Sequence, residues 1–315
     1  MSTPKKHHFI PKGLLRNFAF DKNRKKINFI DKHSGELLSS SIGKVARQHF
    51  LYRYSEKGPC IEKSFFGDID NLGVTAIDKI IDKSSLAFLS PQDKKNLMRF
   101  VAAQMLRVPA TLKQLEGFEE DIRFAFDGEY SIIKDSPHSD FLDSIVKGVD
   151  VYESLLSKKS MTVFYFRDPD KNFIIGDVPV TQRQYGLKST SQLSHSPAIP
   201  IVDWDFIALP ISPNFLLVYY NDAPQDELKL LALENNNWQF IQSEDFLYSR
   251  NQSHLSAGLK DHYKTCYRYV QSVNPAYLKQ NSIKFGDRIE VARPILAFSE
   301  NAKQQMRSLL SQASK

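Results

Sequence analysis

The spacing of hydrophobic residues changes abruptly within the first twenty positions of the chain. Residues 5–10 lack helical spacing and are followed by Pro11, after which Leu14, Leu15 and Phe18 recur at helical spacing. Proline favours an extended conformation in the residue before it and can itself open a helix. The pattern therefore predicts a short strand followed by a helix whose apolar face docks into the core.

Alternating apolar positions predict strands in three further regions. Ile27, Phe29 and Leu37 flank the polar residues 31–36, which indicates a β-hairpin with a glycine turn. Residues 161–166 and 173–175 predict a second strand pair around a polar turn, and residues 206–213 and 215–220 predict strands separated by a proline-containing turn. Residues 181–198 are rich in Ser, Gln and Thr and predict a loop.

Helical periodicity is clearest in the first half of the chain. Apolar residues between 61 and 80 form an approximate stripe, and Ser90, Pro91 and Asp93 are typical of a helix start before residue 106. Further helices are expected over 112–157, with a break near 135–138, over 245–270 and over 301–315. Together the elements predict an α+β fold. We expect one integrated domain, 1–315, with a soft division into an N-terminal lobe, 1–158, and a sheet-containing lobe, 159–315.

The composition is that of a folded protein, with 42% hydrophobic and 25% charged residues in a chain of 315. No apolar run approaches the roughly 20 residues that span a membrane. The basic N-terminus lacks the apolar core of a signal peptide, and Cys60 and Cys266 are too few for a disulfide framework. These features predict a cytoplasmic protein without a membrane partner, and they leave its oligomeric state open.

Positive charge is concentrated at the N-terminus. Residues 1–50 hold eleven Lys and Arg against three Asp and Glu, so this segment carries +8 while the whole chain carries +6. A basic face of this kind can attract the phosphate backbone of DNA or RNA. The alternative is a solvated surface around a hairpin.

Four residues near the helices and the first strand have side chains suited to catalysis or metal binding. His7 and His8 are adjacent on an extended segment, so their side chains point to opposite sides and only one can face a given pocket. Glu62 and Asp70 are eight residues apart and can share one helix face, where two carboxylates can hold a divalent cation or position water. An acidic helix surface is the alternative.

Four other residues are candidates for binding substrate or for positioning a carboxylate. Gln104 and Arg107 lie three apart on a helix, and Arg107 can clamp a phosphate or pair with a helix acid. Lys44 can contact phosphate or lie on the surface. Asp177 ends a strand before Pro179, where it can serve as a positioned carboxylate or cap a turn.

The segment from His7 to Phe18 reads His-His-x-x-Pro-x-x-x-Leu-x-x-Phe, which resembles the opening signature of a large bacterial family of uncharacterised proteins. Three later segments are similar to that family: Lys-Val-Ala at 44–46, Gln-x-x-Arg-x-Pro at 104–109 and Asp-x-Pro at 177–179. The chain departs from the usual pattern at Val108, where threonine is common, and at Gly176, where serine or threonine is common. The resemblance implies acidic residues in the 61–80 helix but no particular reaction.

A shorter similarity connects the histidine pair to the first motif of His-Asn-His nucleases. Such a site also needs an asparagine and a further histidine on the following helix. Asn17 is present, and His33 or His49 would have to supply the histidine, although neither spacing follows the nuclease pattern.

From these observations we expect a hydrolase acting on nucleic acid, specifically a nuclease of a bacterial toxin or defence type. His8 would be the general base or a metal ligand with His7 in support, or the reverse, and the other groups would supply carboxylates and phosphate contacts. A divalent metal, Mg or Mn, would be held by His8, Glu62 and Asp70. The remaining predicted roles are a catalytic carboxylate at Asp177 and substrate binding by Lys44, Gln104 and Arg107.

The rival hypothesis is a non-catalytic protein that binds a ligand or another protein. The same polar residues would then form a structural network that joins the lobes. Both hypotheses predict that the polar residues meet in one place, because a lone buried charge is costly unless it is paired. The residues expected to meet are His7 or His8, Glu62, Gln104, Arg107 and Asp177.

Overall fold

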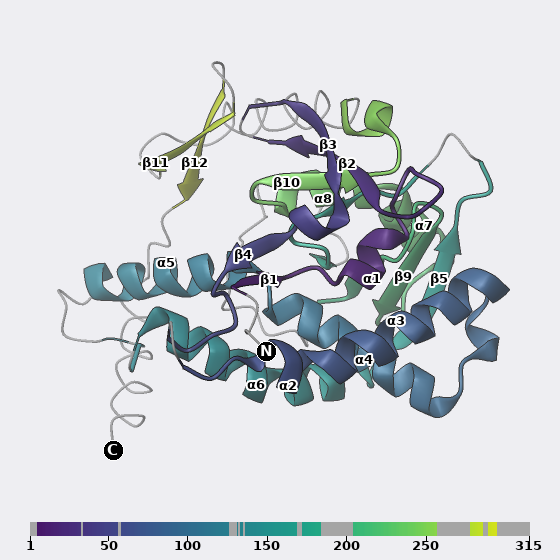
Figure 1. Cartoon of the computed structure of the whole chain (residues 1–315), viewed down its shortest axis with the longest axis horizontal. Coiled ribbons are helices and arrows are strands. Elements are labelled where there is room, and N and C mark those ends of the chain that lie inside the picture. Colours follow the sequence, from purple (N-terminus) through teal and green to yellow (C-terminus); the bar gives the residue numbers. More distant parts are fainter. Residues whose placement is uncertain are drawn as a thin grey trace.

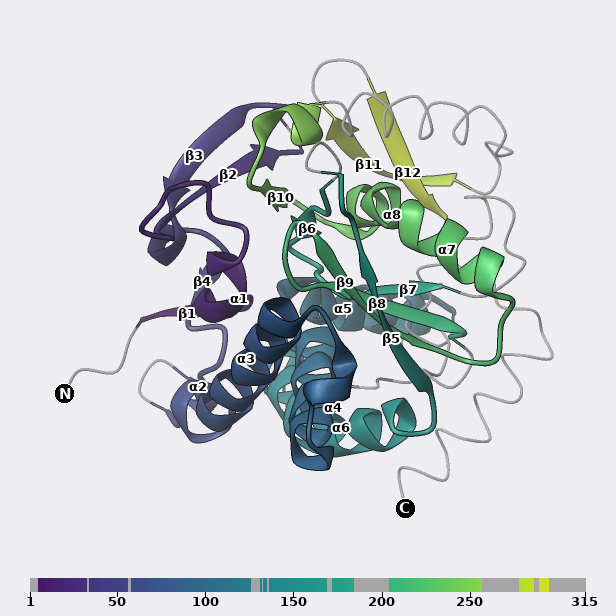
Figure 2. The same cartoon turned by 90° about the vertical axis from the view of Figure 1, so that its right-hand side faces the viewer.

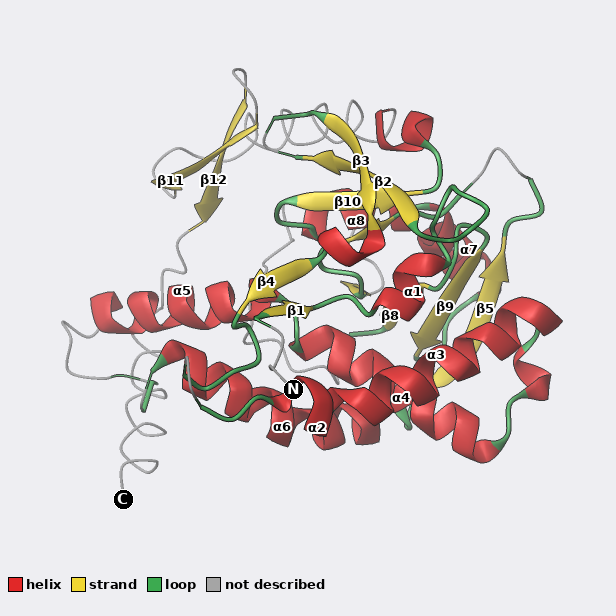
Figure 3. Ribbon diagram, in the orientation of Figure 1, coloured by secondary structure: helices red, strands yellow, loops and turns green. Residues whose placement is uncertain are grey.

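The structure is a computed structural model of the whole chain. It describes residues 5–32, 34–55, 58–125, 131, 133–134, 136–168, 172–183, 204–256, 278–285 and 289–294. Within these ranges helices combine with strand pairs that are all antiparallel, which confirms the predicted α+β class. Figure 3 shows this mixture of helices and strands. None of the helices described is both long and apolar enough to cross a membrane.

The histidine pair lies on a short strand that leads into a short helix, as the proline and the leucine spacing predict. Strand β1 spans Lys6–His8 and helix α1 spans Lys12–Arg16. Strand β4, Arg47–His49, pairs with β1 in antiparallel register and sets His8 opposite Arg47. Leu14, Leu15 and Phe18 are fully buried in the core behind α1.

One four-stranded sheet combines strands from both ends of the chain. Its order is β3-β2-β10-β6, with β2 at Lys26–Asp31, β3 at Leu37–Ser41, β10 at Phe246–Ser249 and β6 at Ile175–Gly176. Strands β2 and β3 form the predicted hairpin, and Gly35 in its turn has a φ of 72°, a conformation that suits glycine. A single 3-10 turn, η1 at Ile42–Lys44, follows β3.

A second sheet has the order β5-β9-β8-β7. Its strands span Ser160–Tyr165, Phe215–Tyr220, Phe206–Pro210 and Thr181–Arg183 respectively. Strands β8 and β9 form the predicted pair around the proline-containing turn. A separate hairpin joins β11, Leu278–Phe285, to β12, Ile289–Pro294.

Helices occupy the predicted regions between residues 61 and 157, but the expected helix over 61–80 is divided at Phe65 and a new helix begins at Pro109. They are α2 at Ile61–Ser64, α3 at Phe66–Lys83, η2 at Leu86–Phe88, α4 at Pro91–Leu106, α5 at Pro109–Ala125 and α6 at Pro137–Leu156. Helix α4 begins with a full capping box, because the Ser90 side chain accepts from Asp93 N while the Asp93 carboxylate accepts from Ser90 N. Two more helices follow, α7 at Gln225–Leu233 and α8 at Asn235–Gln242. Helix α7 packs on β8 and β9 of the second sheet, and Phe240 of α8 packs on β2 and β10 of the first.

Helices lie on one side of the molecule and the sheet β3-β2-β10-β6 lies on the other (Figure 1). In both Figure 1 and Figure 2, α3, α4 and α6 lie below, β2, β3 and β10 lie above, and β1 with α1 lies between them. The histidine strand is therefore held between the helical layer and a sheet that contains C-terminal residues.

Three predictions about local structure were wrong. Residues 161–166 and 173–175 do not pair with each other, because β5 pairs with β9 while β6 pairs with β10. The expected helix over 245–270 contains strand β10 at its start, and the expected loop over 181–198 begins with strand β7. The rest of that loop, residues 257–270 and the expected helix over 301–315 lie outside the described residues.

Candidate functional site

Strand β1 points His7 inward, where it is fully buried. Its ring stacks on Tyr52 with 5.7 Å between the ring centroids and 4° between the planes. The Nδ1 atom accepts a hydrogen bond of 2.9 Å from the backbone N–H of Tyr52. Because Nδ1 is the acceptor, the ring hydrogen of the neutral imidazole lies on Nε2.

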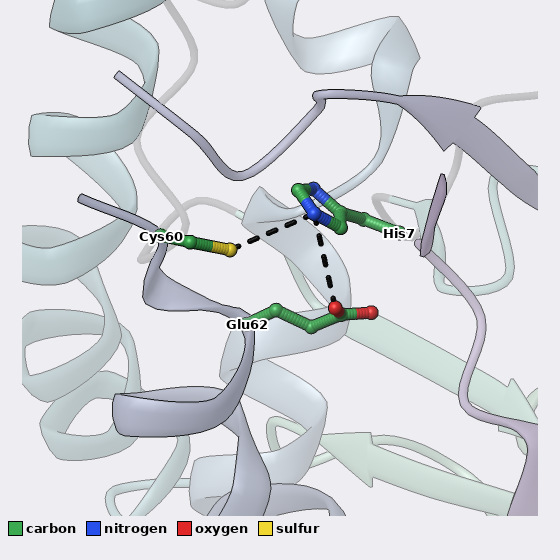
Figure 4. Close-up of side chains that lie close together, drawn as sticks. All are labelled: His7, Cys60 and Glu62. Atoms are coloured by element: carbon green, nitrogen blue, oxygen red, sulfur yellow. Dashed lines mark hydrogen bonds and ion pairs between the residues drawn. The ribbon is translucent and has the colours of Figure 1, made fainter. Parts of the chain in front are cut away.

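The Nε2 atom of His7 faces two side chains at the start of helix α2. Cys60 Sγ lies 3.6 Å away and Glu62 Oε2 lies 3.8 Å away. Figure 4 shows the three side chains converging, with Cys60 from the residue before the helix and Glu62 from its first turn. The three potential ligand atoms all lie within 4.8 Å of one another.

This spacing approaches that of a tetrahedral metal centre, but the hydrogen bonding of His7 opposes one. A zinc ion with its usual bond lengths to nitrogen, oxygen and sulfur sets its ligand atoms roughly 3.3–3.6 Å apart. A histidine that binds metal normally presents a lone pair to the ion and donates its other N–H to an acceptor. His7 has the reverse arrangement, because its Nδ1 accepts from Tyr52 and its Nε2 presents the hydrogen to Cys60 and Glu62.

His8 points to the other side of β1, as adjacent residues on a strand must. Its backbone N–H lies 3.4 Å from Glu62 Oε1, so Glu62 faces both histidines. Its Nε2 atom is buried and has no hydrogen-bond partner among the described residues. Burial lowers the pKa of His8 to about 4, with the charges of Lys12, Arg47 and Arg107 acting in the same direction. The imidazole is therefore neutral at pH 7.

Arg107 closes the far side of the cluster at the C-terminal end of α4. Its side chain is 1% exposed and donates from Nη1 to Asp70 Oδ1 at 2.6 Å and from Nη2 to the carbonyl of His8 at 2.8 Å. Its Nε donates to the hydroxyl of Tyr52, 3.3 Å away, and the guanidinium carbon lies 4.2 Å from the Phe66 ring centroid. Burial alone would lower the pKa of Arg107, but the Asp70 charge and these hydrogen bonds raise it, so the group stays cationic.

Gln104 supports the same arginine from one turn earlier on α4. It is 1% exposed. With its amide nitrogen toward the carbonyl of Phe9, at 3.3 Å, its oxygen accepts from Arg107 Nη1, also at 3.3 Å. Gln104 and Arg107 are thus buried and directed at protein groups, which is the alternative that the sequence left open for Arg107.

Asp177 has different partners from the other predicted site residues. Its carboxylate accepts from the backbone N–H groups of Glu244, Asp245 and Phe246 at 2.8, 2.7 and 2.9 Å. Burial raises the pKa of Asp177 to about 6, while the backbone hydrogen bonds act in the opposite direction. This carboxylate therefore holds the turn before β10, which is the capping role left open by the sequence.

A pocket of about 340 Å³ lies between the β4 segment, the start of α5 and the turn before β10. Lys44, Arg47 and Asp177 are among the residues that line it. Lys113 also lines it and lies 3.5 Å from a Glu244 carboxylate oxygen. Of the residues predicted from the sequence, Lys44 and Asp177 belong to this pocket, while His7, His8, Glu62, Asp70, Gln104 and Arg107 belong to the histidine cluster.

Sequence reasoning missed four residues that shape the histidine cluster. Cys60 was set aside as one of two isolated cysteines, although it precedes Glu62 by only two positions. No motif in the sequence marks Tyr52, and Lys12 and Arg47 contribute there only to the charge of the basic segment. The β1–β4 register, which brings Arg47 opposite His8, has no local signal in the sequence.

Comparison with known proteins gives one match. A family model described as a protein of unknown function, DUF4238, matches residues 6–253, which include both the histidine cluster and the pocket. No curated protein and no solved structure shows a significant match to the chain.

Proposed function

The chain belongs to the DUF4238 family, and we propose that it is a hydrolase of phosphodiester bonds in DNA or RNA. The observation that carries the proposal is the setting of His8. An imidazole whose Nε2 has no hydrogen-bond partner among the described residues lies within the electrostatic influence of three cations. Positive groups beside a neutral base can stabilise the charge that develops on a phosphate ester. A pKa of about 4 makes His8 a weak base near pH 7, because a general base works best with a pKa near the operating pH.

In the proposed reaction His8 is the general base. It takes a proton from a water molecule as the water oxygen attacks phosphorus and the bond to the leaving oxygen breaks. Lys12 and Arg47 attract the phosphate and stabilise the negative charge that develops on it. His7 and Glu62 position the strand from behind, because the Glu62 carboxylate faces both the His7 ring and the His8 backbone.

Arg107 and Gln104 receive a positioning role in this proposal. The Arg107 side chain holds the carbonyl of His8 and thereby fixes the strand that carries the base. Direct binding of phosphate by these two residues stays a prediction, and both side chains are 1% exposed. Lys44 is exposed and is available for phosphate binding.

A divalent cation is a separate part of the proposal. Glu62 and Asp70 are 22% and 24% exposed, and carboxylates with accessible water are the ligands that Mg²⁺ and Mn²⁺ prefer. The cleavage assay therefore includes each metal and a chelator. A metal requirement would assign these carboxylates a direct role beside His8.

The test is cleavage of labelled single- and double-stranded DNA and RNA by purified protein. We expect His8→Ala to reduce the rate roughly 10²–10⁴-fold, the range for loss of a general base. The matched control is His138→Ala, because His138 lies in the first turn of helix α6, where its Nε2 atom is 3.0 Å from the Arg53 carbonyl oxygen. Intact substrates with the wild type under every metal condition, or equal rates for the wild type and His8→Ala, would refute the proposal.

A bacterial expression test addresses the proposed toxin or defence role. Cells producing the wild type should grow slowly and contain degraded DNA or RNA, whereas cells producing His8→Ala should not. Indistinguishable cultures with intact nucleic acid would count against a toxin.

The second candidate is a non-catalytic binding protein, and the Arg107 network favours it. That network is closed, since Arg107 donates to Asp70, the His8 carbonyl and Tyr52, and Tyr52 O–H donates back to the Arg107 carbonyl at 2.8 Å. Such an arrangement stabilises a fold without any reaction. Tight binding of nucleic acid with no cleavage by the wild type would select this candidate.

A further inference from the structure

The pocket beside β4 has the dimensions and walls of a small-ligand site. Its volume of about 340 Å³ lies at the lower end of the range for such sites, roughly 300–1,000 Å³. Phe9, Phe29 and Phe246 supply aromatic lining, and the Phe29 and Phe246 rings meet edge to face with their centroids 5.9 Å apart. Aromatic walls of this kind suit a flat ring, as in nucleobase binding.

The pocket is lined by charged groups of both signs. Lys44 and Arg47 come from the segment η1–β4 and are both cationic. The carboxylates of Glu244 and Asp245 come from the turn before β10, where they lie 3.5 and 3.8 Å from Lys113 Nζ. A complementary ligand combines an anionic group, a flat ring and hydrogen-bond donors.

We infer that this pocket is a nucleotide subsite, in which Lys44 and Arg47 hold the phosphate and the aromatic side chains hold the base. A nucleotide combines an anionic phosphate with a flat base that carries N–H donors, which matches the cations, aromatic side chains and carboxylates of the lining. An aromatic amino acid fits less well, because its carboxylate and ammonium share one carbon atom. A sugar lacks both the flat ring and the anionic end.

The inference deepens the proposed function, and its link to cleavage rests on that function. Arg47 lines the pocket and also faces His8 across the β1–β4 pair, where its charge contributes to the low pKa of His8. Phe9, the next residue after His8, lines the pocket as well. A phosphate held by Arg47 would thus lie beside the proposed base, and the pocket would hold the nucleotide next to the bond that breaks.

The test is binding of nucleoside 5′-monophosphates, measured by calorimetry and by protein NMR, to the wild-type full chain. We expect adenosine without phosphate and inorganic phosphate alone each to bind at least about tenfold more weakly than 5′-AMP. Lys44→Glu should weaken 5′-AMP binding at least about tenfold, because it reverses a charge at the phosphate end. The matched control is Lys158→Glu, an exposed lysine after helix α6.

Each outcome decides the inference separately from the nuclease proposal. Binding of 5′-AMP that depends on Lys44 supports the subsite even if no nucleic acid is cleaved. Absence of binding by all four monophosphates, equal loss in Lys44→Glu and Lys158→Glu, or binding of inorganic phosphate as tight as that of 5′-AMP would overturn it. Cleavage without nucleotide binding would keep the nuclease and remove the subsite.

Discussion

Replacing Arg107 by methionine should destabilise the protein strongly, because the arginine is the buried centre of the polar cluster. The substitution keeps much of the apolar side chain but removes the donors to Asp70, the His8 carbonyl and the Tyr52 hydroxyl. Removing one partner of a buried ion pair costs about 3–5 kcal/mol. The hydrogen bond from Tyr52 O–H to the residue 107 carbonyl involves only the backbone there and should survive.

We therefore expect the free energy of unfolding to fall by about 4 kcal/mol, a large part of the roughly 5–15 kcal/mol of a typical protein. Urea denaturation followed by far-UV circular dichroism measures this as a lower midpoint with an unchanged slope. The matched control is Arg99→Met on the same helix. Arg99 pairs with Asp150 and Glu153 but is 34% exposed, so its loss should cost less than about 1 kcal/mol.

A double-mutant cycle with Asp70→Asn isolates the pair. Its coupling energy should fall between about 0.5 and 3 kcal/mol, the range for residues in direct contact. A loss below about 1 kcal/mol in Arg107→Met, or one equal to that in Arg99→Met, would refute the reasoning. A folded Arg107→Lys variant that keeps full stability but loses cleavage would show that Arg107 acts in the reaction, either by holding the His8 carbonyl or by the phosphate contact predicted from the sequence.

Three further predictions follow from the charges and packing. Because the pKa of His8 is lowered to about 4, its imidazole stays neutral well below pH 6.5, so the acid limb of kcat/KM for cleavage should fall near pH 4. Reversing the charge of Lys22, Lys25 and Lys26 to Glu should weaken nucleic-acid binding and reduce its salt dependence. The log–log slope of affinity against salt is roughly −0.9 per duplex phosphate neutralised. In helix α3, Gly73→Ala should cost about 1–3 kcal/mol, because the added methyl group overlaps the Phe100 side chain.

Each of these predictions has a control and a contrary result. An acid limb near pH 6.5 would show that His8 is not the titrating base. Reversing the charge of three other exposed lysines, Lys94, Lys147 and Lys158, should leave the salt slope unchanged. An affinity that does not depend on salt would refute the contact with the phosphate backbone. Gly117→Ala in helix α5 should be neutral or stabilising, because nothing lies within 4 Å of the added atom, so an equal cost at both glycines would contradict the packing argument.

Features with local causes could be predicted from the sequence. The start of α4 follows from Ser90, Pro91 and Asp93, because Ser90 and Asp93 accept hydrogen bonds from each other's backbone N–H groups and Pro91 has no backbone N–H. The histidine strand and α1 follow from Pro11 and the leucine spacing. In each case the residues that determine the element lie within a few positions of one another.

Features that depend on distant partners could not be predicted. Phe246–Ser249 follows an acidic stretch and suggested a helix, but pairing with β2 on one side and β6 on the other makes it a strand. The apolar residues 173–175 suggested a hairpin with β5, but β5 pairs with β9 and β6 pairs with β10. A strand takes its partner from the whole sheet, and that information is not carried in the strand itself.

The candidate site shows the same division. The chemistry of His8, Glu62 and Arg107 was visible because polar residues adjoin apolar or rigid segments. The partners of these side chains could not be predicted from the sequence. Arg107 pairs with Asp70, and Asp177 holds the turn before β10. The orientation of His7 depends on a backbone N–H at Tyr52, which no side-chain pattern reveals.

The pairing of β2 with β10 has a consequence for synthesis of the chain on the ribosome. Strand β2 ends at Asp31, and its partner begins only at Phe246, more than 200 residues later. Arg250 likewise donates to the carbonyls of Asn17 and Ala19, so the N-terminal region is completed late. Until β10 emerges, β2 presents an unpaired edge to the cell, which is a template for aggregation. A nascent chain interrupted before residue 246 lacks the partner of that edge, so we expect such a fragment to aggregate.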